Sequence, residues 1–283
     1  MYFIPEAICL DMDGTLLNNY NEVTENTLST IQELRKAGIR VFIVTGRTYN
    51  EVFDAAPENM EVDGFVTANG MVTYVNGRKI SEYHLPFDLA EKVVYAASEN
   101  EIYYEAHPND GERLALSKDE NFMKSMFAGE KPEEVGINEW MEREASINRD
   151  LEWKKNLPGQ KYAKVFFFHT SAEKIDNWKL QLEEMKEGQN FTTASSSKHS
   201  VEVMVEGVSK ATGIDILLKH YQLSTSKTMA IGDSNNDIPM MKFVGYPVAM
   251  KNATDQIKQI VAETTKYTND EEGVHRYLAN IFR

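Results

Sequence analysis

The sequence predicts an α/β protein with a Rossmann-like parallel-sheet core and an inserted α+β cap domain. Short apolar runs alternate with helix-like segments near both ends of the chain, and this alternation is typical of strand–helix–strand units in a parallel sheet. From about residue 86 to residue 195 the alternation stops, and aromatic and charged residues become dense. The length of 283 residues also favours two domains.

The N-terminal part supplies the first strands of the core. Short apolar runs bounded by polar or turn residues indicate buried strands, and Asn76-Gly77 is a strong hairpin signal. Gly38 and Pro57 lie where helices should stop. The predicted elements are strands 7–10, 41–44 and 64–67, helices 24–36 and 50–56, and a hairpin of 71–75 with 78–83.

The rest of the chain gives the cap and then returns to the core. In the cap we predict helices 89–98 and 175–185 around a strand at 161–170, and the polar run 195–198 is interpreted as a linker. After it we predict strands 201–205, 229–231 and 246–249, helices 210–221 and 238–243, and further helices toward the C-terminus. The predicted domains are therefore a core of 1–85 with 196–283 and a cap of 86–195.

Composition limits the classes of partner. The formal net charge of -14 argues against nucleic acid, which binds basic surfaces, but allows a small phosphate ester in a locally positive site. The single cysteine, Cys9, cannot form a disulfide within the chain. No apolar run reaches the length of a membrane span, and residues 1–10 lack the basic start of a secretory signal. We expect a cytoplasmic protein without an obligate protein partner.

Two acidic segments follow predicted core strands. Asp11 and Asp13 come directly after the first strand, and Gly14 beside them permits a turn. Asp233 and Asp237 follow a later strand in the run 231–237. Ligands of open parallel sheets bind at this edge, and clustered carboxylates there favour a hard divalent cation such as Mg²⁺. The alternatives are solvated turns, with Asp237 capping the next helix.

Two further segments suit a phosphate group. Thr45, Gly46 and Arg47 follow a strand and offer a hydroxyl and backbone N–H groups, although Thr45 could equally be an ordinary helix cap. Ser209 is expected to cap the next helix, and Lys210 begins it. A lysine is unfavourable at the positive end of a helix dipole, so a neighbouring anion would explain it better than solvent alone.

These four segments resemble, in the same order, the four motifs of the haloacid dehalogenase superfamily. The specific parts are Asp-Met-Asp-Gly-Thr-Leu and Gly-Asp-Ser-Asn-Asn-Asp. A cap between the second and third motifs resembles the subclass with a C2 (type IIB) cap. The segments Ala68-Asn69-Gly70 and Gly207-Val208-Ser209-Lys210 resemble the Cof-type branch.

The resemblance implies a magnesium-dependent phosphatase that hydrolyses small phosphorylated metabolites, such as sugar phosphates, through an aspartyl-phosphate. It makes Asp11 the nucleophile and Asp13 the general acid and base, whose double role favours a pKa near the working pH. The implied metal ligands are Asp11, the backbone carbonyl of Asp13, and Asp233, with Asp237 ordering the metal surroundings or binding through water. The implied substrate-binding residues are Met12, Thr45, Gly46, Arg47, Asn69, Lys210 and Asn236.

Two alternatives remain at this stage. A phosphosugar mutase would use the same aspartyl-phosphate, and a metabolite-binding protein would have lost turnover, although the complete set of acidic residues with Lys210 counts against the second. In the cap, several polar residues could reach a substrate, but packing is the favoured interpretation of each. They are Tyr104, His107, Arg113, Lys164 and His169.

Overall fold

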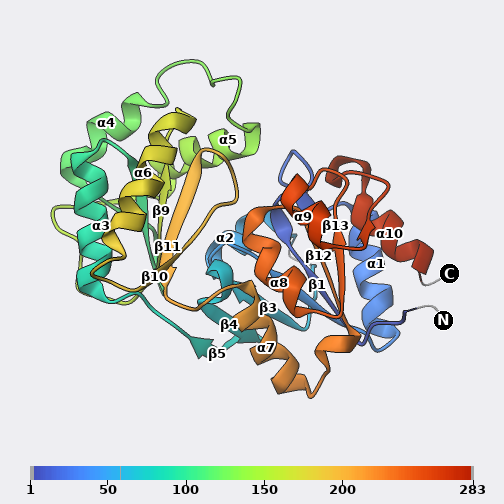
Figure 1. Cartoon of the computed structure of the whole chain (residues 1–283). Coiled ribbons are helices and arrows are strands. Elements are labelled where there is room, and N and C mark those ends of the chain that lie inside the picture. The colour runs from blue at the N-terminus through green and yellow to red at the C-terminus, as the bar shows by residue number, and fades with distance from the viewer. Residues whose placement is uncertain (1–2, 58, 282–283) are drawn as a thin grey trace. The chain divides into compact units, whose positions relative to one another are not determined.

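The structure is a computed structural model that describes residues 3–57 and 59–281 (Figure 1). The chain divides into two compact units. The first, called the core, comprises Met1–Glu82 and Val208–Arg283, and the second, called the cap, comprises Tyr83–Gly207.

The core contains one eight-stranded sheet in the order β14-β13-β12-β1-β2-β3-β4-β5. The pairs from β14 to β3 are parallel, and β3, β4 and β5 are antiparallel. The strands are β1 (Ala7–Leu10), β2 (Arg40–Val44), β3 (Gly64–Thr67), β4 (Val72–Val75), β5 (Arg78–Glu82), β12 (Thr228–Gly232), β13 (Tyr246–Ala249) and β14 (Glu263–Thr264). The predicted Rossmann-like sheet is confirmed.

Six helices accompany this sheet. Helix α7 packs on β3 and β4 and against α8, while α1 packs on β2 and against α10. The helices are α1 (Glu25–Lys36), α2 (Tyr49–Ala55), α7 (Lys210–Tyr221), α8 (Ile238–Phe243), α9 (Asp255–Ile260) and α10 (Gly273–Ile281). Thr24 caps α1, where its hydroxyl accepts a bond from the Thr27 amide, and Gly38 at φ +87° lies just past the helix end.

The cap is built on a six-stranded sheet in the order β10-β11-β9-β6-β7-β8, in which only β7 and β8 pair in parallel. Its strands are β6 (Tyr103–Pro108), β7 (Leu114–Leu116), β8 (Glu152–Lys154), β9 (Tyr162–Phe168), β10 (Phe191–Ala194) and β11 (Ser200–Val205). Its helices are α3 (Phe87–Glu99), α4 (Glu120–Ser125), α5 (Ile137–Ala145) and α6 (Ala172–Met185).

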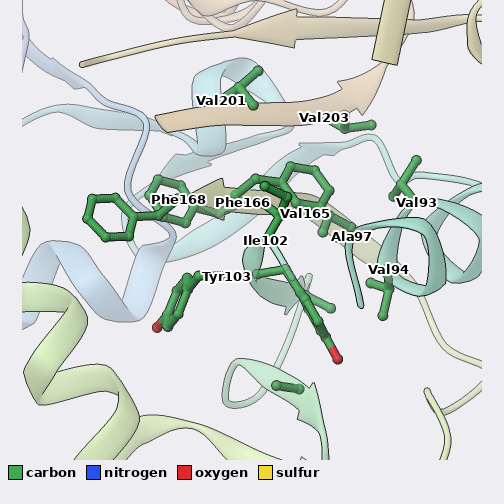
Figure 2. Close-up of a cluster of buried hydrophobic side chains, with 14 of the residues drawn as sticks. Val93, Val94, Ala97, Ile102, Tyr103, Val165, Phe166, Phe168, Val201 and Val203 are labelled. Atoms are coloured by element: carbon green, nitrogen blue, oxygen red, sulfur yellow. The ribbon is translucent and has the colours of Figure 1, made fainter. Parts of the chain in front are cut away.

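The cap has its own hydrophobic core. Figure 2 shows Val93 and Val94 of α3 in the same buried cluster as Val165 of β9 and Val201 and Val203 of β11. Helix α3 packs on β6 and β9, and α6 packs on β11. The cap therefore buries apolar surface between its own helices and its own sheet, as an independent domain does.

The predicted return to the core after residue 195 is wrong. Strand β11 pairs antiparallel with β9 and with β10, so residues 196–207 belong to the cap. The polar run 195–198 lies between β10 and β11. A polar run indicates a loop, but it does not distinguish a turn between two paired strands from a linker between domains. The cap also begins slightly earlier than predicted, at Tyr83.

Gly213 allows α7 to approach the sheet closely. A Cβ atom at this position would lie 2.2 Å from Val66 Cγ1 and 3.0 Å from Val66 Cβ. Val66 is fully buried in β3. Helix propensity alone favours alanine over glycine by about 1 kcal/mol, but overpacking of this kind costs about 1–3 kcal/mol.

Because the 2.2 Å contact puts the overpacking cost in the upper part of this range, at about 2–3 kcal/mol, and helix propensity offsets about 1 kcal/mol of it, we expect Gly213→Ala to lower the stability of the protein by about 1–2 kcal/mol in urea unfolding. Gly159→Ala is the matched control, because nothing lies within 4 Å of its added Cβ. In a Val66→Ala background the Gly213→Ala change should become neutral or stabilising. A Gly213→Ala protein as stable as the control would contradict the close approach of α7 to β3.

Candidate active site

The predicted site segments meet at one edge of the core sheet. Strands β12, β1 and β2 are neighbours, and Leu10 is in register with Ile231 on one side and Ile43 on the other. The residues that follow these strands, Asp11, Asp233 and Thr45, are therefore brought to the same edge. The positions predicted from strand ends are the positions at which the structure gathers the acidic and phosphate-suited groups.

Three carboxylates and one lysine form the centre of this edge. Asp11, Asp233 and Asp237 each offer a carboxylate oxygen, and these oxygens lie within 4.8 Å of one another. The Lys210 ammonium donates to Asp11 Oδ1 and to Asp237 Oδ1, each at 2.6 Å. Lys210 is fully buried. The anion expected beside this lysine is thus present as two carboxylates of the protein itself.

The charges of this cluster are not balanced. Burial, together with the Asp237 carboxylate, raises the pKa of Asp11 to about 7 even though Lys210 opposes the shift. Burial and the neighbouring Asp11 and Asp237 also hold the pKa of Asp233 well above its ordinary value. Burial by itself would lower the pKa of Lys210, but its two carboxylate partners raise it. One ammonium group is insufficient for three carboxylates, so a second cation fits the site.

The donor set indicates which kind of cation would fit. All the clustered ligand atoms are carboxylate oxygens, which suit a hard ion such as Mg²⁺. Asp233 Oδ1 accepts a bond from the Thr15 hydroxyl at 3.1 Å. Gly14 has φ +73°, and a Cβ there would lie 2.4 Å from Asp233 Oδ2. The absence of a side chain at Gly14 therefore leaves room for the Asp233 carboxylate.

Asp237 has a structural role in this cluster. Its Oδ2 accepts bonds from the backbone amides of Asp233 at 2.9 Å and Ser234 at 3.0 Å, while its Oδ1 accepts from Lys210. Asp237 stands at the position that precedes α8, but its side chain makes no capping bond to that helix. The carboxylate instead closes its own loop and orients Lys210.

Asp13 is not among the three clustered carboxylates and pairs with Arg47. Arg47 Nη2 donates to Asp13 Oδ1 at 2.7 Å, and Arg47 Nε donates to Asp13 Oδ2 at 3.0 Å. Desolvation would raise the pKa of Asp13, but 47% of the side chain is exposed, and the guanidinium holds the pKa below its ordinary value. The sequence analysis expected the pKa of Asp13 to lie near the working pH. While Asp13 is paired with Arg47, its pKa lies below the ordinary value instead.

Thr45 is not a helix cap, because α2 begins at Tyr49 after Thr48. The Thr45 hydroxyl accepts a bond from the Arg47 amide at 3.1 Å, so its own hydrogen remains available to donate. Ser209 does cap α7, as predicted. Met12 is fully buried, which leaves only its backbone for a substrate.

Gly46, Asn69 and Asn236 converge beside Thr45. Asn236 Nδ2 donates to Asn69 Oδ1 at 3.1 Å. A Cβ on Gly46 would lie 3.3 Å from Asn69 Nδ2 and 3.5 Å from Asn236 Nδ2. Asn69 has φ 55°, between Ala68 at 46° and Gly70 at 101°, a run of left-handed backbone of the kind that is found at functional sites.

The polar cap residues singled out in the sequence have partners within the cap. The Glu105 carboxylate accepts from Arg113 Nη1 at 3.2 Å and lies 3.0 Å from His107 Nε2, and Lys164 donates to Glu202 at 2.6 Å. These contacts support the packing interpretation. For two other candidates the contacts are similar: Tyr104 donates to Asp119 at 2.6 Å, and His169 Nδ1 accepts from the Ser171 amide at 2.9 Å.

The sequence analysis missed Thr15, Asn252 and Thr254, which bond to the acidic loops. Thr15 lies inside the first motif, two residues after Asp13, so its position in the sequence could have predicted a place in the site. Asn252 and Thr254 follow β13, whose carboxyl end lies beside that of β12. No local pattern marks Asn252, because its partner Gly14 is 238 residues away in the chain.

Comparison with known proteins gives a consistent result. Residues 8–278 match the model of a family described as haloacid dehalogenase-like hydrolase. A Bacillus subtilis protein named 5-amino-6-(5-phospho-D-ribitylamino)uracil phosphatase is 29% identical over 282 residues, which cover 98% of each chain. A haloacid dehalogenase-like hydrolase structure from B. subtilis has a TM-score of 0.81 at 23% identity and covers 97% of this chain and 99% of its own. A subclass IIB sugar phosphatase structure has a TM-score of 0.72 at 19% identity and covers 98% of both.

Among the helices of residues 3–57 and 59–281, none is both long enough and apolar enough to cross a membrane.

The raised pKa values of Asp11 and Asp233 predict how stability depends on pH and on Mg²⁺. Without metal, the folded Asp11 keeps its proton between the ordinary pKa of 3.8 and about 7, where the unfolded chain releases it. The contribution of Asp11 to the free energy of unfolding is therefore full below the unfolded pKa of 3.8, and it is lost as the pH rises through the folded pKa of about 7. Because Mg²⁺ favours the ionised carboxylates, the rise in Tm on adding Mg²⁺ should be larger at about pH 8 than at about pH 5.

The measurement is thermal unfolding of chelator-treated protein with and without Mg²⁺. Asp233→Asn should remove most of the Mg²⁺-dependent rise in Tm. Asp176→Asn is the control, because this side chain is 70% exposed on α6 of the cap. An equal rise in Tm at both pH values would contradict the assignment of the cation to these carboxylates.

Proposed function

This chain belongs to the haloacid dehalogenase-like hydrolases, and we propose that it is a Mg²⁺-dependent phosphatase that acts through an aspartyl-phosphate on Asp11. One observation carries the proposal. The Asp11 carboxylate is buried at the edge of a parallel sheet, 2.6 Å from the Lys210 ammonium and grouped with Asp233 and Asp237. A carboxylate in contact with an ammonium group and with a metal-suited cluster supports a role as the nucleophile toward phosphorus.

Asp11, Asp233 and the backbone carbonyl of Asp13 would hold the Mg²⁺ ion. Asp237 already uses both oxygens within the protein, so it would act on the ion through water or through Lys210. When bound, Mg²⁺ supplies positive charge that keeps Asp11 ionised and offsets the charge of the phosphoryl group.

The phosphoryl group would be held mainly by Thr45 and Lys210. The Thr45 hydroxyl has a hydrogen to donate, and Lys210 brings a buried positive charge at the start of α7. The Gly46 and Met12 backbones and the Asn236 carboxamide would complete the set. In this arrangement most of the catalysis is positioning and charge neutralisation.

The reaction has two balanced steps. In the first, the Asp11 carboxylate attacks phosphorus, the bond from phosphorus to the ester oxygen breaks, and the Asp13 carboxyl donates its proton to the leaving oxygen. In the second, water attacks phosphorus, the Asp13 carboxylate takes a proton from that water, and the bond from phosphorus to Asp11 breaks. Phosphate leaves and both aspartates return to their starting forms.

Arg47 affects the two steps differently. Its ion pair with Asp13 favours the ionised carboxylate, which is the form that the second step needs. The first step needs the protonated carboxyl, so the pair must open as the ester binds. Arg47 is then released toward the substrate, which is consistent with a role in substrate binding.

For the substrate we propose small phosphate monoesters of the sugar or polyol type. The named Bacillus subtilis relative acts on a phosphorylated ribityl compound, and one structural neighbour is a sugar phosphatase. The net charge of -14 supports a small ligand rather than nucleic acid. A single buried cysteine suits the reducing cytoplasm, where we place the protein.

A phosphosugar mutase is the nearest alternative, because it would share the aspartyl-phosphate. Incubation with a sugar bisphosphate distinguishes the two: a phosphatase releases inorganic phosphate, whereas a mutase yields an isomerised sugar phosphate. A protein that only binds metabolites would release no phosphate from an aryl phosphate or from any tested ester.

The nucleophile can be tested by Asp11→Asn. The amide has nearly the same shape, but it is a poor nucleophile and a weaker metal ligand. We expect kcat to fall by more than about a hundredfold, with an unchanged fold by circular dichroism. A folded Asp11→Asn protein with near-normal turnover in excess Mg²⁺ would show that Asp11 is not the nucleophile.

The metal can be tested by chelation and replacement. We expect activity to disappear on exhaustive chelation, to return with Mg²⁺ and to return poorly with Ca²⁺. Mg²⁺ requires compact octahedral coordination, whereas Ca²⁺ prefers more and longer oxygen bonds, and one of these could engage both oxygens of Asp11. Full activity of protein shown to be metal-free by elemental analysis would refute the Mg²⁺ dependence.

A further inference from the structure

A short loop after β13 contacts both acidic loops of the site. We call residues 250–254 the clamp loop. Asn252 Nδ2 donates to the carbonyl oxygen of Gly14 at 2.7 Å. The Thr254 amide donates to the carbonyl oxygen of Asp233 at 2.9 Å. One five-residue segment is therefore bonded to the loop that follows β1 and to the loop that follows β12.

The two acidic loops contact each other at Gly14 and Thr15. Thr15 Oγ1, one residue further on, donates to Asp233 Oδ1 at 3.1 Å. A Cβ on Gly14 would overlap the Asp233 carboxylate, at 2.4 Å from Oδ2. The Gly14 peptide thus has the Asp233 carboxylate on one side and bonds through its carbonyl to Asn252. A shift of this peptide would move the first loop relative to Asp233.

The orientation of the Asn252 carboxamide is determined by two partners. Its Oδ1 accepts from the Asn269 amide at 3.2 Å, which leaves Nδ2 for the Gly14 carbonyl. The Asn269 amide belongs to the short helical turn Asn269–Glu271, which is held by its own backbone bonds, such as the 3.2 Å bond from the Glu272 amide to the Asn269 carbonyl. The Asn269 side chain makes a separate contact, in which Nδ2 donates to the Leu17 carbonyl at 2.9 Å. Asn252 therefore reaches Gly14 from a segment that is itself held in place.

Asp233 is held from both sides of its own peptide chain. Its amide donates to Asp237 Oδ2 at 2.9 Å, and its carbonyl accepts from Thr254. The Thr254 hydroxyl also donates to Asn235 Oδ1 at 3.2 Å, and the Met250 amide donates to the Gly232 carbonyl at 2.9 Å. The clamp loop thus follows the second acidic loop closely while it reaches across to the first.

We propose that Asn252 is a positioning residue of the metal site, which sets the separation between the Asp11 loop and Asp233 through the Gly14 carbonyl. The inference rests on the proposed Mg²⁺ dependence. Mg²⁺ tolerates little variation around oxygen distances of about 2.0–2.1 Å, so a drift of one acidic loop against the other lowers affinity. Groups that orient metal ligands from outside typically change metal affinity by about 10–100-fold when removed.

A purely structural role for Asn252 would have a different signature. The side chain is exposed, so water can replace its donor to Gly14 with a small effect on unfolding. If Asn252 only fastened the C-terminal segment, then loss of the neighbouring bond from Asn269 to Leu17 would have the same effect. Asn269 contacts the same N-terminal segment three residues beyond Gly14, which makes Asn269→Ala a matched control.

The experiment measures the Kd for Mg²⁺ by calorimetry on the chelator-treated full chain. We expect Asn252→Ala to raise this Kd by about 10–100-fold and Asn269→Ala to change it by less than about threefold. Asn252→Asp keeps the acceptor for the Asn269 amide and removes only the donor to Gly14. We expect it to weaken Mg²⁺ binding as well, although its added negative charge alone would attract the cation.

The outcomes separate this inference from the proposed function. Wild-type protein that binds no Mg²⁺ overturns both. Wild-type protein that binds Mg²⁺, with an unchanged Kd in a folded Asn252→Ala or Asn252→Asp variant, overturns the role of Asn252 alone. If Asn269→Ala weakens Mg²⁺ binding as much as Asn252→Ala does, the positioning role of Asn252 is also overturned. Both residues would then only attach the C-terminal segment to the rest of the core.

Discussion

The site depends on the placement of the Lys210 ammonium between two buried carboxylates. Its bonds to Asp11 and Asp237, each of 2.6 Å, stabilise a charge that would be costly alone in a fully buried position. Asp237 then closes the loop that carries Asp233. The orientation of Asp11, the metal-suited oxygens and the start of α7 are therefore coupled through one ammonium group.

Sheet topology explains why these groups can meet at all. The loop that carries Asp11 and the loop that carries Asp233 are more than 200 residues apart in the chain, yet β1 and β12 are parallel neighbours with no shift in their pairing register. Parallel neighbours end at the same edge, so the loops that follow them share one volume. In the chain, the cap is inserted between β5 and α7. It interrupts none of the strands β12, β1 and β2, so their order in the sheet is unchanged.

Local signals in the sequence were sufficient for most of the core. The strand that precedes Asp11 and the hairpin at Asn76-Gly77 each carry their own pattern, and the structure has them at the predicted positions within a few residues. The polar run 195–198 led to a wrong domain boundary, because turns between paired strands and linkers between domains are both polar. Strand β6 was missed because buried Glu105 and His107 interrupt its apolar pattern. These two residues pair with each other, and Glu105 also pairs with Arg143 of α5.

Within the site, sequence identified the groups but not their pairing. Nothing near Asp13 in the chain indicates that Arg47, 34 residues away, holds its carboxylate. The same holds for Asn252, whose contact with Gly14 depends on two loops from distant strands. Such contacts are tertiary, so the spacing of residues in the sequence does not predict them. The resemblance of four short motifs to a known family supplied the roles, while the hydrogen bonds that tune those roles required the fold.

The contrast between global and local charge explains what kind of ligand the core favours. The chain carries a net charge of -14, which repels polyanions at long range. At the sheet edge, however, Lys210 stands at the N-terminus of α7, where the helix dipole adds to its positive charge. A lysine there would destabilise an isolated helix, and here the buried carboxylates of Asp11 and Asp237 compensate it. In the proposed function, a cation bound to these carboxylates would leave the field of Lys210 and the helix N-terminus for a phosphoryl group. Such a local positive field within a chain of net charge -14 would favour a single small phosphate group over an extended polyanion.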